Sequence, residues 1–260
     1  MTILVFDIET IPDIQLGKTI FNIDNSNDDD TYKAMMYLHR QNNPNSKILP
    51  LFLHKIVAIS ITLKSHNKFK VWSLGTEKSD EKDLLIRFFE GLDKYTPILI
   101  SWNGSNFDLP VIQYRALKHG ITSHIYWETG QSNSNFRWNN YLNRYHERHT
   151  DLMDVLASYS PKAFSSLQNI SHLVKLPGKM GLDGSKVYES YKNNDIKSIR
   201  NYCEIDVLNT YLIFLRFELI KGNHTTKEYL EEIEQIQNYL KSTNEDHFIK
   251  YLEEWIKLTE

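Results

Sequence analysis

Four carboxylates and one tyrosine fall in three short stretches whose spacing could support metal-assisted cleavage of phosphodiester bonds. The first stretch is Phe6-Asp7-Ile8-Glu9-Thr10, the second is Asn103-Gly104-Ser105-Asn106-Phe107-Asp108, and the third is Tyr202-Cys203-Glu204-Ile205-Asp206. Carboxylate oxygens suit Mg²⁺ and Mn²⁺, and two such ions roughly 3.5–4 Å apart can catalyse phosphoryl transfer. Each stretch is a weak signal alone, but their occurrence together nominates a reaction as well as a fold.

The first carboxylates, Asp7 and Glu9, follow the apolar run Ile3 to Phe6, which predicts a short buried strand. Side chains two positions apart on a strand project from the same face, so both acids would point to one side. Crowded acids at a buried strand are costly unless cations compensate their charge. The alternative interpretation is a strand end with two solvated acids, which is the commoner origin of such a pair.

Asp108 lies between a second apolar strand, Ile98 to Trp102, and a helix that we expect to run to about His119, with Gly120 as its stop. Aspartate is a favoured N-cap, so a purely structural role is the alternative for this residue. The preceding Asn103 and Phe107 favour a functional role. Asparagine can hydrogen-bond a sugar or phosphate, and a phenyl ring can stack on a base.

Tyr202 and Asp206 are four residues apart on a long predicted helix that spans about 195–219, and therefore share one of its faces. The tyrosine could hold an attacking water while the aspartate holds a metal ion. A half-buried tyrosine beside a surface acid is the alternative, and this pair alone does not distinguish the two.

The surrounding pattern predicts an α/β fold with a mixed β-sheet flanked by helices. Further strands are expected at 56–63 and 69–72, as a hairpin, and helices at 79–92, 151–159 and 164–176. Polar residues predict an exposed, mobile excursion at 23–47 with one short helix near Tyr32 to His39, and irregular structure at 128–148. We expect one domain over residues 1–220.

Residues 221–260 predict a C-terminal extension of two amphipathic helices, the first with a capping box formed by Thr225 and Glu228. We expect these helices to pack on the same domain. An arm that binds a partner protein is the alternative.

The bulk composition is that of a soluble globular protein, with 41% hydrophobic and 24% charged residues. The net charge of -3 counts mildly against nucleic-acid binding, although an acidic metal cluster can offset a basic groove. One cysteine permits no intrachain disulfide and favours a reducing compartment. The first residues lack the features of a signal peptide and no stretch is long enough to span a membrane, so we expect a cytoplasmic protein.

In this order, the three acidic stretches resemble the signature of the DEDD superfamily of 3′–5′ exonucleases, which have a ribonuclease H-like fold. The tyrosine branch carries D-x-E, then N-x₂₋₃-[FY]-D, then Y-x₃-D. The histidine branch would need a histidine at position 201, which is Asn201 here. The segments Ser101-Trp102-Asn103-Gly104, His149-Thr150-Asp151-Leu152 and Leu176-Pro177-Gly178-Lys179 add a likeness to predicted exonucleases related to the proofreading domain of family-B DNA polymerases. The resemblance covers about residues 1–217.

The resemblance implies a role for each of the five residues. Asp7 would bridge two divalent ions, Mg²⁺ or Mn²⁺, while Glu9 and Asp206 complete one ion site and Asp108 supports the other through water. Tyr202 would orient the nucleophilic water.

The same resemblance places Thr10, Asn103 and Phe107 near the 3′-terminal nucleotide. Lys179, with Lys175 and Lys186, flanks a glycine-rich loop at 177–184. These lysines could clamp a nucleic-acid backbone, or they could belong to a solvated loop.

The leading hypothesis is a metal-dependent 3′–5′ exonuclease that acts on single-stranded or frayed DNA ends and releases 5′-mononucleotides. The alternatives are an exoribonuclease that trims RNA 3′ ends with the same residues, and a non-catalytic nucleic-acid-binding or interaction module. The residues beyond 217 are too few for a polymerase domain, so we expect the protein to act alone or with a separate polymerase or repair partner.

Overall fold

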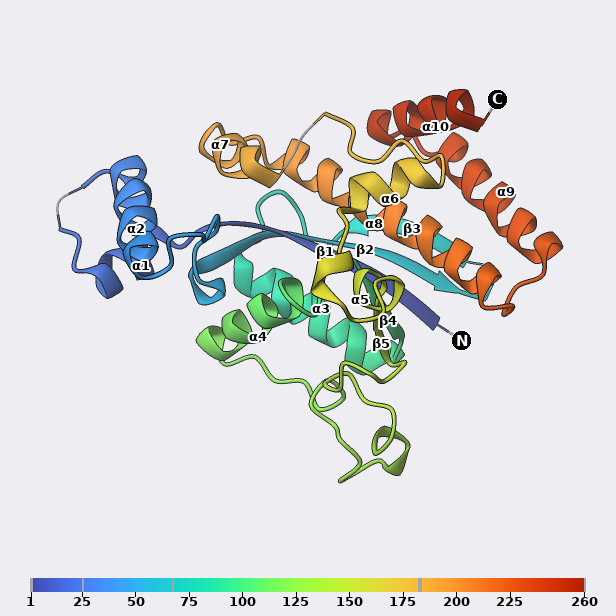
Figure 1. The fold of residues 1–260 in the computed structure, drawn as a ribbon, viewed down its shortest axis with the longest axis horizontal. Coiled ribbons are helices and arrows are strands. Elements are labelled where there is room, and N and C mark those ends of the chain that lie inside the picture. Colours follow the sequence, from blue (N-terminus) through green and yellow to red (C-terminus); the bar gives the residue numbers. More distant parts are fainter. Residues whose placement is uncertain (1, 25, 67, 182–183, 260) are drawn as a thin grey trace.

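A five-stranded mixed sheet forms the centre of the molecule (Figure 1). The computed structural model describes residues 2–24, 26–66, 68–181 and 184–259. The strand order is β3-β2-β1-β4-β5, with β1 antiparallel to β2, β2 antiparallel to β3, and β4 parallel to both β1 and β5. The strands are β1 (Thr2–Pro12), β2 (His54–Ser65), β3 (Lys68–Ser73), β4 (Ile98–Ser101) and β5 (His149–Asp151).

Helices cover both faces of this sheet, as the α/β prediction requires (Figure 1). One face packs against α3 (Glu81–Tyr95) and α4 (Asp108–His119), and contributes Leu4, Phe6 and Ile8 of β1 to that core. The other face contributes Ile3 and Val5 of β1 and packs against the C-terminal half of the chain. The elements on that side are α6 (Leu167–Leu173), α8 (Ile196–Ile220), α9 (Thr226–Ser242) and α10 (Asp246–Thr259).

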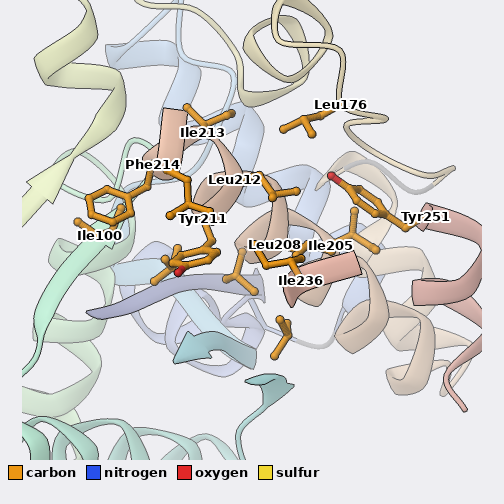
Figure 2. Packing of buried hydrophobic residues seen from close by; sticks show 14 of the residues in the cluster. Ile100, Leu176, Ile205, Leu208, Tyr211, Leu212, Ile213, Phe214, Ile236 and Tyr251 are labelled. Atoms are coloured by element: carbon orange, nitrogen blue, oxygen red, sulfur yellow. The ribbon is translucent and has the colours of Figure 1, made fainter. Parts of the chain in front are cut away.

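Helix α8 is buried on most of its surface because it lies between the sheet and the two last helices. Figure 2 shows Tyr211 and Phe214 of α8 near Ile100 of β4, and Ile236 of α9 and Tyr251 of α10 in the same cluster. A helix that is apolar nearly all round is typical of such an internal position. The residues that flank Tyr202 and Asp206 are therefore fixed by packing on several sides.

Helices α9 and α10 pack on α8 through buried residues that include Leu240, Phe248 and Trp255. The capping box at the start of α9 is confirmed, because the Thr225 side chain accepts from the Glu228 backbone N–H and the Glu228 side chain accepts from the Thr225 N–H. None of the described helices combines the length and the apolarity that crossing a membrane demands.

The segment that follows β1 contains more helix than its polar composition indicates. Helix α1 (Ile14–Phe21) was not predicted, and α2 (Asp28–Asn42) is longer than the short helix expected near Tyr32 to His39. Asn27 caps α2 by accepting from the Asp30 N–H, and the acidic residues 28–30 form its first turn. Acidic residues in the first turn of a helix interact favourably with the helix dipole. For this reason a run of polar residues that is typical of a loop begins a helix here.

Two expected helices differ in extent, and two short elements were not predicted. Helix α5 (Leu152–Leu156) and α6 are shorter than the expected spans, because Asp151 ends β5, and a turn, a short 3-10 helix (Pro161–Ala163) and irregular backbone separate the two helices. Strand β5 was missed since it has only three residues, and α7 (Val187–Lys192) was missed at the end of the glycine-rich loop. Residues 182 and 183 of that loop lie outside the described part of the chain.

Candidate active site

A pocket of about 300 Å³ brings together the five residues that the sequence nominates from three separate elements. Asp7 and Glu9 come from β1, Asp108 from the start of α4, and Tyr202 and Asp206 from α8. Asn103, Phe107 and Lys179 also line it. The remaining lining residues are Ile8, Trp102, Met153, Ser165, Ser166, Leu167 and Gly184.

Strand β1 places Asp7 and Glu9 on the face that meets α8. Alternation along the strand sends Ile3 and Val5 to that face, and the two acids continue the same series. The strand is longer than the sequence predicts, because β1 continues past the two acids and keeps its pairing with β2 as far as Pro12. The acids therefore lie within a strand, and Glu9 is buried rather than solvated at a strand end.

The turn from β4 to α4 is fixed by a carboxylate that the sequence did not identify as important for the site. Asp151, at the end of β5, accepts from the backbone N–H of Asn103 at 2.8 Å and of Ser105 at 2.9 Å. Asn103 has a φ of 64°, a left-handed conformation that asparagine tolerates better than most residues. This anchored turn delivers Asp108 to the pocket.

Asp108 is the first residue of α4 and does not cap it; the N-cap position is Phe107, which makes no side-chain capping bond. The Asp108 carboxylate instead accepts from the backbone N–H of Ile8 at 3.1 Å, across to β1. The N-cap interpretation is thus replaced by a link between two of the acidic stretches. Because Ile8 lies between Asp7 and Glu9 in the sequence, this bond ties Asp108 to the strand that carries both acids.

Tyr202 and Asp206 face the pocket one turn apart on α8, and Lys179 reaches both. The Lys179 ammonium donates to the Tyr202 hydroxyl and lies 3.8 Å from Oδ2 of Asp206. The same ammonium lies 5.1 Å from the centre of the Tyr202 ring. Of the three loop lysines, Lys179 is therefore the one that enters the pocket.

The loop that carries Lys179 is held by side chains from three helices. Gln168 of α6 accepts from the Lys179 N–H at 2.5 Å, and Asn209 of α8 donates to the Gly178 carbonyl at 3.1 Å. Tyr251 of α10 donates to Asn209 at 2.7 Å, so the C-terminal extension supports the site at one remove. Gly178 has a φ of 69°, and a Cβ there would lie 2.5 Å from the Gln168 side chain, which explains the glycine.

Thr10 does not line this pocket. The pairing of β1 with β2 shifts register between Glu9 and Thr10, and the Thr10 hydroxyl lies 2.9 Å from Nδ1 of His54. The His54 ring in turn meets the Phe107 ring edge to face, with centroids 5.1 Å apart. A contact between Thr10 and substrate stays a prediction.

Burial raises the pKa of every carboxyl group in the cluster, and repulsion from neighbouring acids adds to it for Asp7, Glu9 and Asp108. Desolvation is the largest cause for Asp7, followed by the charges of Asp108, Glu9 and Asp206. Desolvation raises the pKa of Asp108 to about 7, and it raises that of Asp206 to about 6 despite the opposing charge of Lys179. The pKa of Tyr202 is also raised far above its usual range by burial and by Asp206, so its phenol keeps its proton.

This donor set fits divalent cations. Four carboxyl groups in one buried pocket are costly without positive charge, and Oδ1 of Asp206 is buried with no hydrogen-bond partner among the described residues. Ligand atoms of Asp7, Glu9 and Cys203 lie within 4.8 Å of one another. Hard cations prefer oxygen, so Asp7 and Glu9 would be the ligands of such an ion, whereas the Cys203 thiol donates to Asp7 at 3.5 Å.

Replacing Asp108 by asparagine is expected to stabilise the metal-free protein increasingly as the pH rises. The pKa of Asp108 in the folded protein, about 7, exceeds its ordinary value of 3.8. The contribution of this carboxyl group to folding stability is therefore complete below about pH 4 and is lost between about pH 4 and pH 7. The loss amounts to at most about 1.4 kcal/mol per pH unit. Melting temperatures in EDTA should differ more between variant and wild type at pH 8 than at pH 5; a constant difference contradicts the raised pKa.

Comparison with known proteins gives a family match over most of the chain. Residues 46–255 match the family described as "Predicted 3′–5′ exonuclease related to the exonuclease domain of PolB". Asp108, Tyr202 and Asp206 lie inside the matched stretch, whereas Asp7 and Glu9 precede it. The structure brings those two acids to the other three.

Similar sequences occur in DNA polymerases. The chain is 26% identical over 144 residues to the catalytic subunit of DNA polymerase epsilon from Dictyostelium discoideum, covering 53% of this chain and 6% of that protein. It is 38% identical over 69 residues to DNA polymerase 1 of Saccharolobus solfataricus, covering 26% of this chain and 8% of that protein. Each match thus spans less than a tenth of the length of the curated relative.

A solved structure shows the same fold. The family B DNA polymerase from the hyperthermophilic archaeon Pyrobaculum calidifontis superposes with a TM-score of 0.50 and 15% sequence identity. The match covers 84% of this chain and 24% of that one. At this sequence identity the likeness establishes the fold but not the chemistry of the pocket.

Proposed function

Because the chain belongs to the family of predicted 3′–5′ exonucleases related to the exonuclease domain of PolB, we propose that it hydrolyses the terminal phosphodiester bond at 3′ ends of single-stranded or frayed DNA. The observation that carries the proposal is the convergence of Asp7, Glu9, Asp108, Tyr202 and Asp206 on one pocket. The products would be 5′-mononucleotides. The protein would act alone or with a separate polymerase or repair protein.

Asp7, Glu9, Asp108 and Asp206 would hold two Mg²⁺ or Mn²⁺ ions. When bound, such ions lower the pKa of the attacking water and neutralise charge on the phosphate oxygens. The carboxylates favour cation binding because they lie close together with little exposure to solvent, and a positive charge would bring down their raised pKa values. The function therefore depends on the same crowding of acids that destabilises the metal-free protein.

Tyr202 and Lys179 supply the polar groups opposite the carboxylates. The Tyr202 phenol remains protonated, so it can orient water through a hydrogen bond without acting as a base. The Lys179 ammonium, which contacts this phenol and Asp206, is placed to attract a phosphate into an otherwise acidic pocket. Positioning and charge compensation are the contributions of these two residues.

Phe107 and Asn103 supply the surfaces for a terminal nucleotide. Both line the pocket beside the acids, and the Phe107 ring is only partly buried. An aromatic ring at this place can stack on a base of any identity, which suits removal of nucleotides in turn. Asn103 adds a side-chain amide that already bonds Asn106 at 3.0 Å and can exchange that bond for a sugar or phosphate oxygen.

We expect faster hydrolysis of DNA than of RNA when matched single strands are compared. Oligomers of one sequence, labelled at the 5′ end, would be incubated with the protein and Mg²⁺ or Mn²⁺, and initial rates measured from gels. The mononucleotides released from the 3′ end carry no 5′ label, and in chromatography they should co-elute with nucleoside 5′-monophosphates. Faster degradation of RNA would replace DNA by RNA as the substrate while leaving the reaction unchanged.

A further inference from the structure

An exposed face beside the pocket combines aromatic and basic side chains. Its members are Arg144 and Tyr145, from the loop before β5, and Tyr159 and Lys162, from the segment after α5. We call it the aromatic–basic face. The Tyr145 ring is 71% exposed and meets the Tyr159 ring with centroids 4.9 Å apart at 64°. The Arg144 guanidinium lies 5.9 Å from the Tyr159 ring.

The loop that presents Tyr145 is an ordered platform despite its irregular backbone. Asn140 accepts from the backbone N–H groups of Leu142 and Asn143, and its own N–H donates to His146. Tyr141 is buried beneath and donates to the Pro97 carbonyl at 2.6 Å. In Figure 1 this loop projects below the sheet as the largest stretch without long helices or strands. Exposure of its aromatic rings is therefore a feature of a structured loop.

The face is tied to the catalytic pocket by the chain itself. Met153 lines the pocket at one end of a short segment, and Ser165 and Ser166 line it at the other. Tyr159 and Lys162 lie between them, within six residues of a pocket residue, a reach of at most about 20 Å. Arg144 is fixed to this segment by two hydrogen bonds of 2.6 Å to the buried carboxylate of Asp154.

The charge of the face opposes that of the pocket. Between residues 137 and 162, the exposed charged side chains are Arg137, Arg144, Glu147 and Lys162. Asp154 pairs with Arg144, and the other three give a basic excess although the whole chain carries -3. Exposed rings interleaved with cations are the combination that binds single strands without sequence preference, by stacking and by attraction to the backbone.

We infer that the aromatic–basic face binds the single strand upstream of its 3′ end, so that several nucleotides are held while the last one occupies the pocket. This inference rests on the proposed function for the direction of the strand. It predicts that affinity increases with length once the strand extends beyond the pocket. DNA and RNA share the base faces and phosphates that the face would contact.

Fluorescence anisotropy in EDTA tests this binding without turnover. The probes are 5′-fluorescein dT4 and dT16, with rU4 and rU16 as the RNA arm. Wild type should bind the 16-mers more tightly than the 4-mers, and Tyr145→Ala should lose most of that gain, weakening 16-mer binding by about 5- to 100-fold. Lys162→Ala should reduce the slope of log K against log salt by about 0.7.

The matched control is Tyr37→Ala, since Tyr37 is 67% exposed on α2, away from this face. It should keep the full length-dependent gain, and circular dichroism would verify folding of each variant. An equal gain in Tyr145→Ala and wild type, or no gain in wild type, overturns the inference while leaving hydrolysis to be judged separately. A third outcome separates the two proposals: the wild type binds 16-mers more tightly than 4-mers, Tyr145→Ala loses this difference, and neither protein hydrolyses a strand. That outcome supports binding by the aromatic–basic face and rejects the exonuclease activity.

Discussion

Replacing Asp7 by asparagine is expected to reduce the rate of 3′-end hydrolysis on the order of 10³-fold or more. Asp7 lines the pocket and interacts with the charges of Asp108, Glu9 and Asp206, so loss of its charge removes the group best placed to hold divalent cations. Metal ions supply several kcal/mol of transition-state stabilisation, and each 1.36 kcal/mol corresponds to about a factor of ten. Initial rates on a 5′-labelled strand at saturating Mg²⁺ or Mn²⁺ would measure the effect.

The same substitution should leave the fold intact, because it relieves repulsion among buried carboxylates. Circular dichroism and an unchanged or raised melting temperature in EDTA would show this. Asp24→Asn is the matched control, since Asp24 is exposed, and it should keep the wild-type rate. A folded Asp7→Asn protein with an undiminished rate would remove the pocket from the reaction.

Replacing Arg115 by methionine is expected to destabilise the protein by about 3–5 kcal/mol, a large effect for a single substitution. Arg115 is 1% exposed and forms hydrogen bonds of 2.6–2.7 Å to Asp13, after β1, and to Glu81, at the start of α3. Removing it takes a shared cationic partner from two buried carboxylates, and leaves Lys118 on Asp13 and His119 on Glu81. Chemical denaturation would give the change in the free energy of unfolding, and the melting temperature should fall by about 10 °C.

Arg87→Met provides the control, because Arg87 also pairs with a carboxylate, Asp83, but on the exposed surface of α3. Its melting temperature should hardly change. A triple variant, Arg115→Met with Asp13→Asn and Glu81→Gln, should recover part of the lost stability, since no buried carboxylate is then left without Arg115. Equal changes in melting temperature for Arg115→Met and Arg87→Met would show that the buried ion pairs contribute no more to stability than the exposed pair.

The acidic stretches and the main elements could be predicted because their signals are local. Apolar residues at helical spacing in Leu84, Leu85 and Phe88 indicate α3, and Gly120 marks the end of α4, where it has a φ of 64°. The period of two along β1 places Asp7 and Glu9 on one face whatever the strand's length. Convergence of the stretches, however, was predicted from their resemblance to a family.

The supports of the site could not be predicted because they join residues that are distant in the sequence. Asp151 fixes the backbone of Asn103 from 48 positions away, and Asp108 reaches Ile8 across 100. Arg115 gave no signal as the centre of an ion cluster, since burial of a charged side chain depends on packing that composition does not reveal. Short elements such as β5 and α7 likewise depend on their neighbours more than on their own residues.

Hydrolysis of a 5′-labelled single-stranded DNA oligomer, with Mg²⁺ or Mn²⁺ and with EDTA, tests the proposed exonuclease activity most directly. We expect a ladder of labelled products that shortens from the 3′ end with either or both metals and is absent in EDTA. The ladder should also be absent for Asp7→Asn. Labelled products that form equally in EDTA, or no products from DNA and RNA with both metals, would contradict the activity and leave a binding role for the acidic pocket.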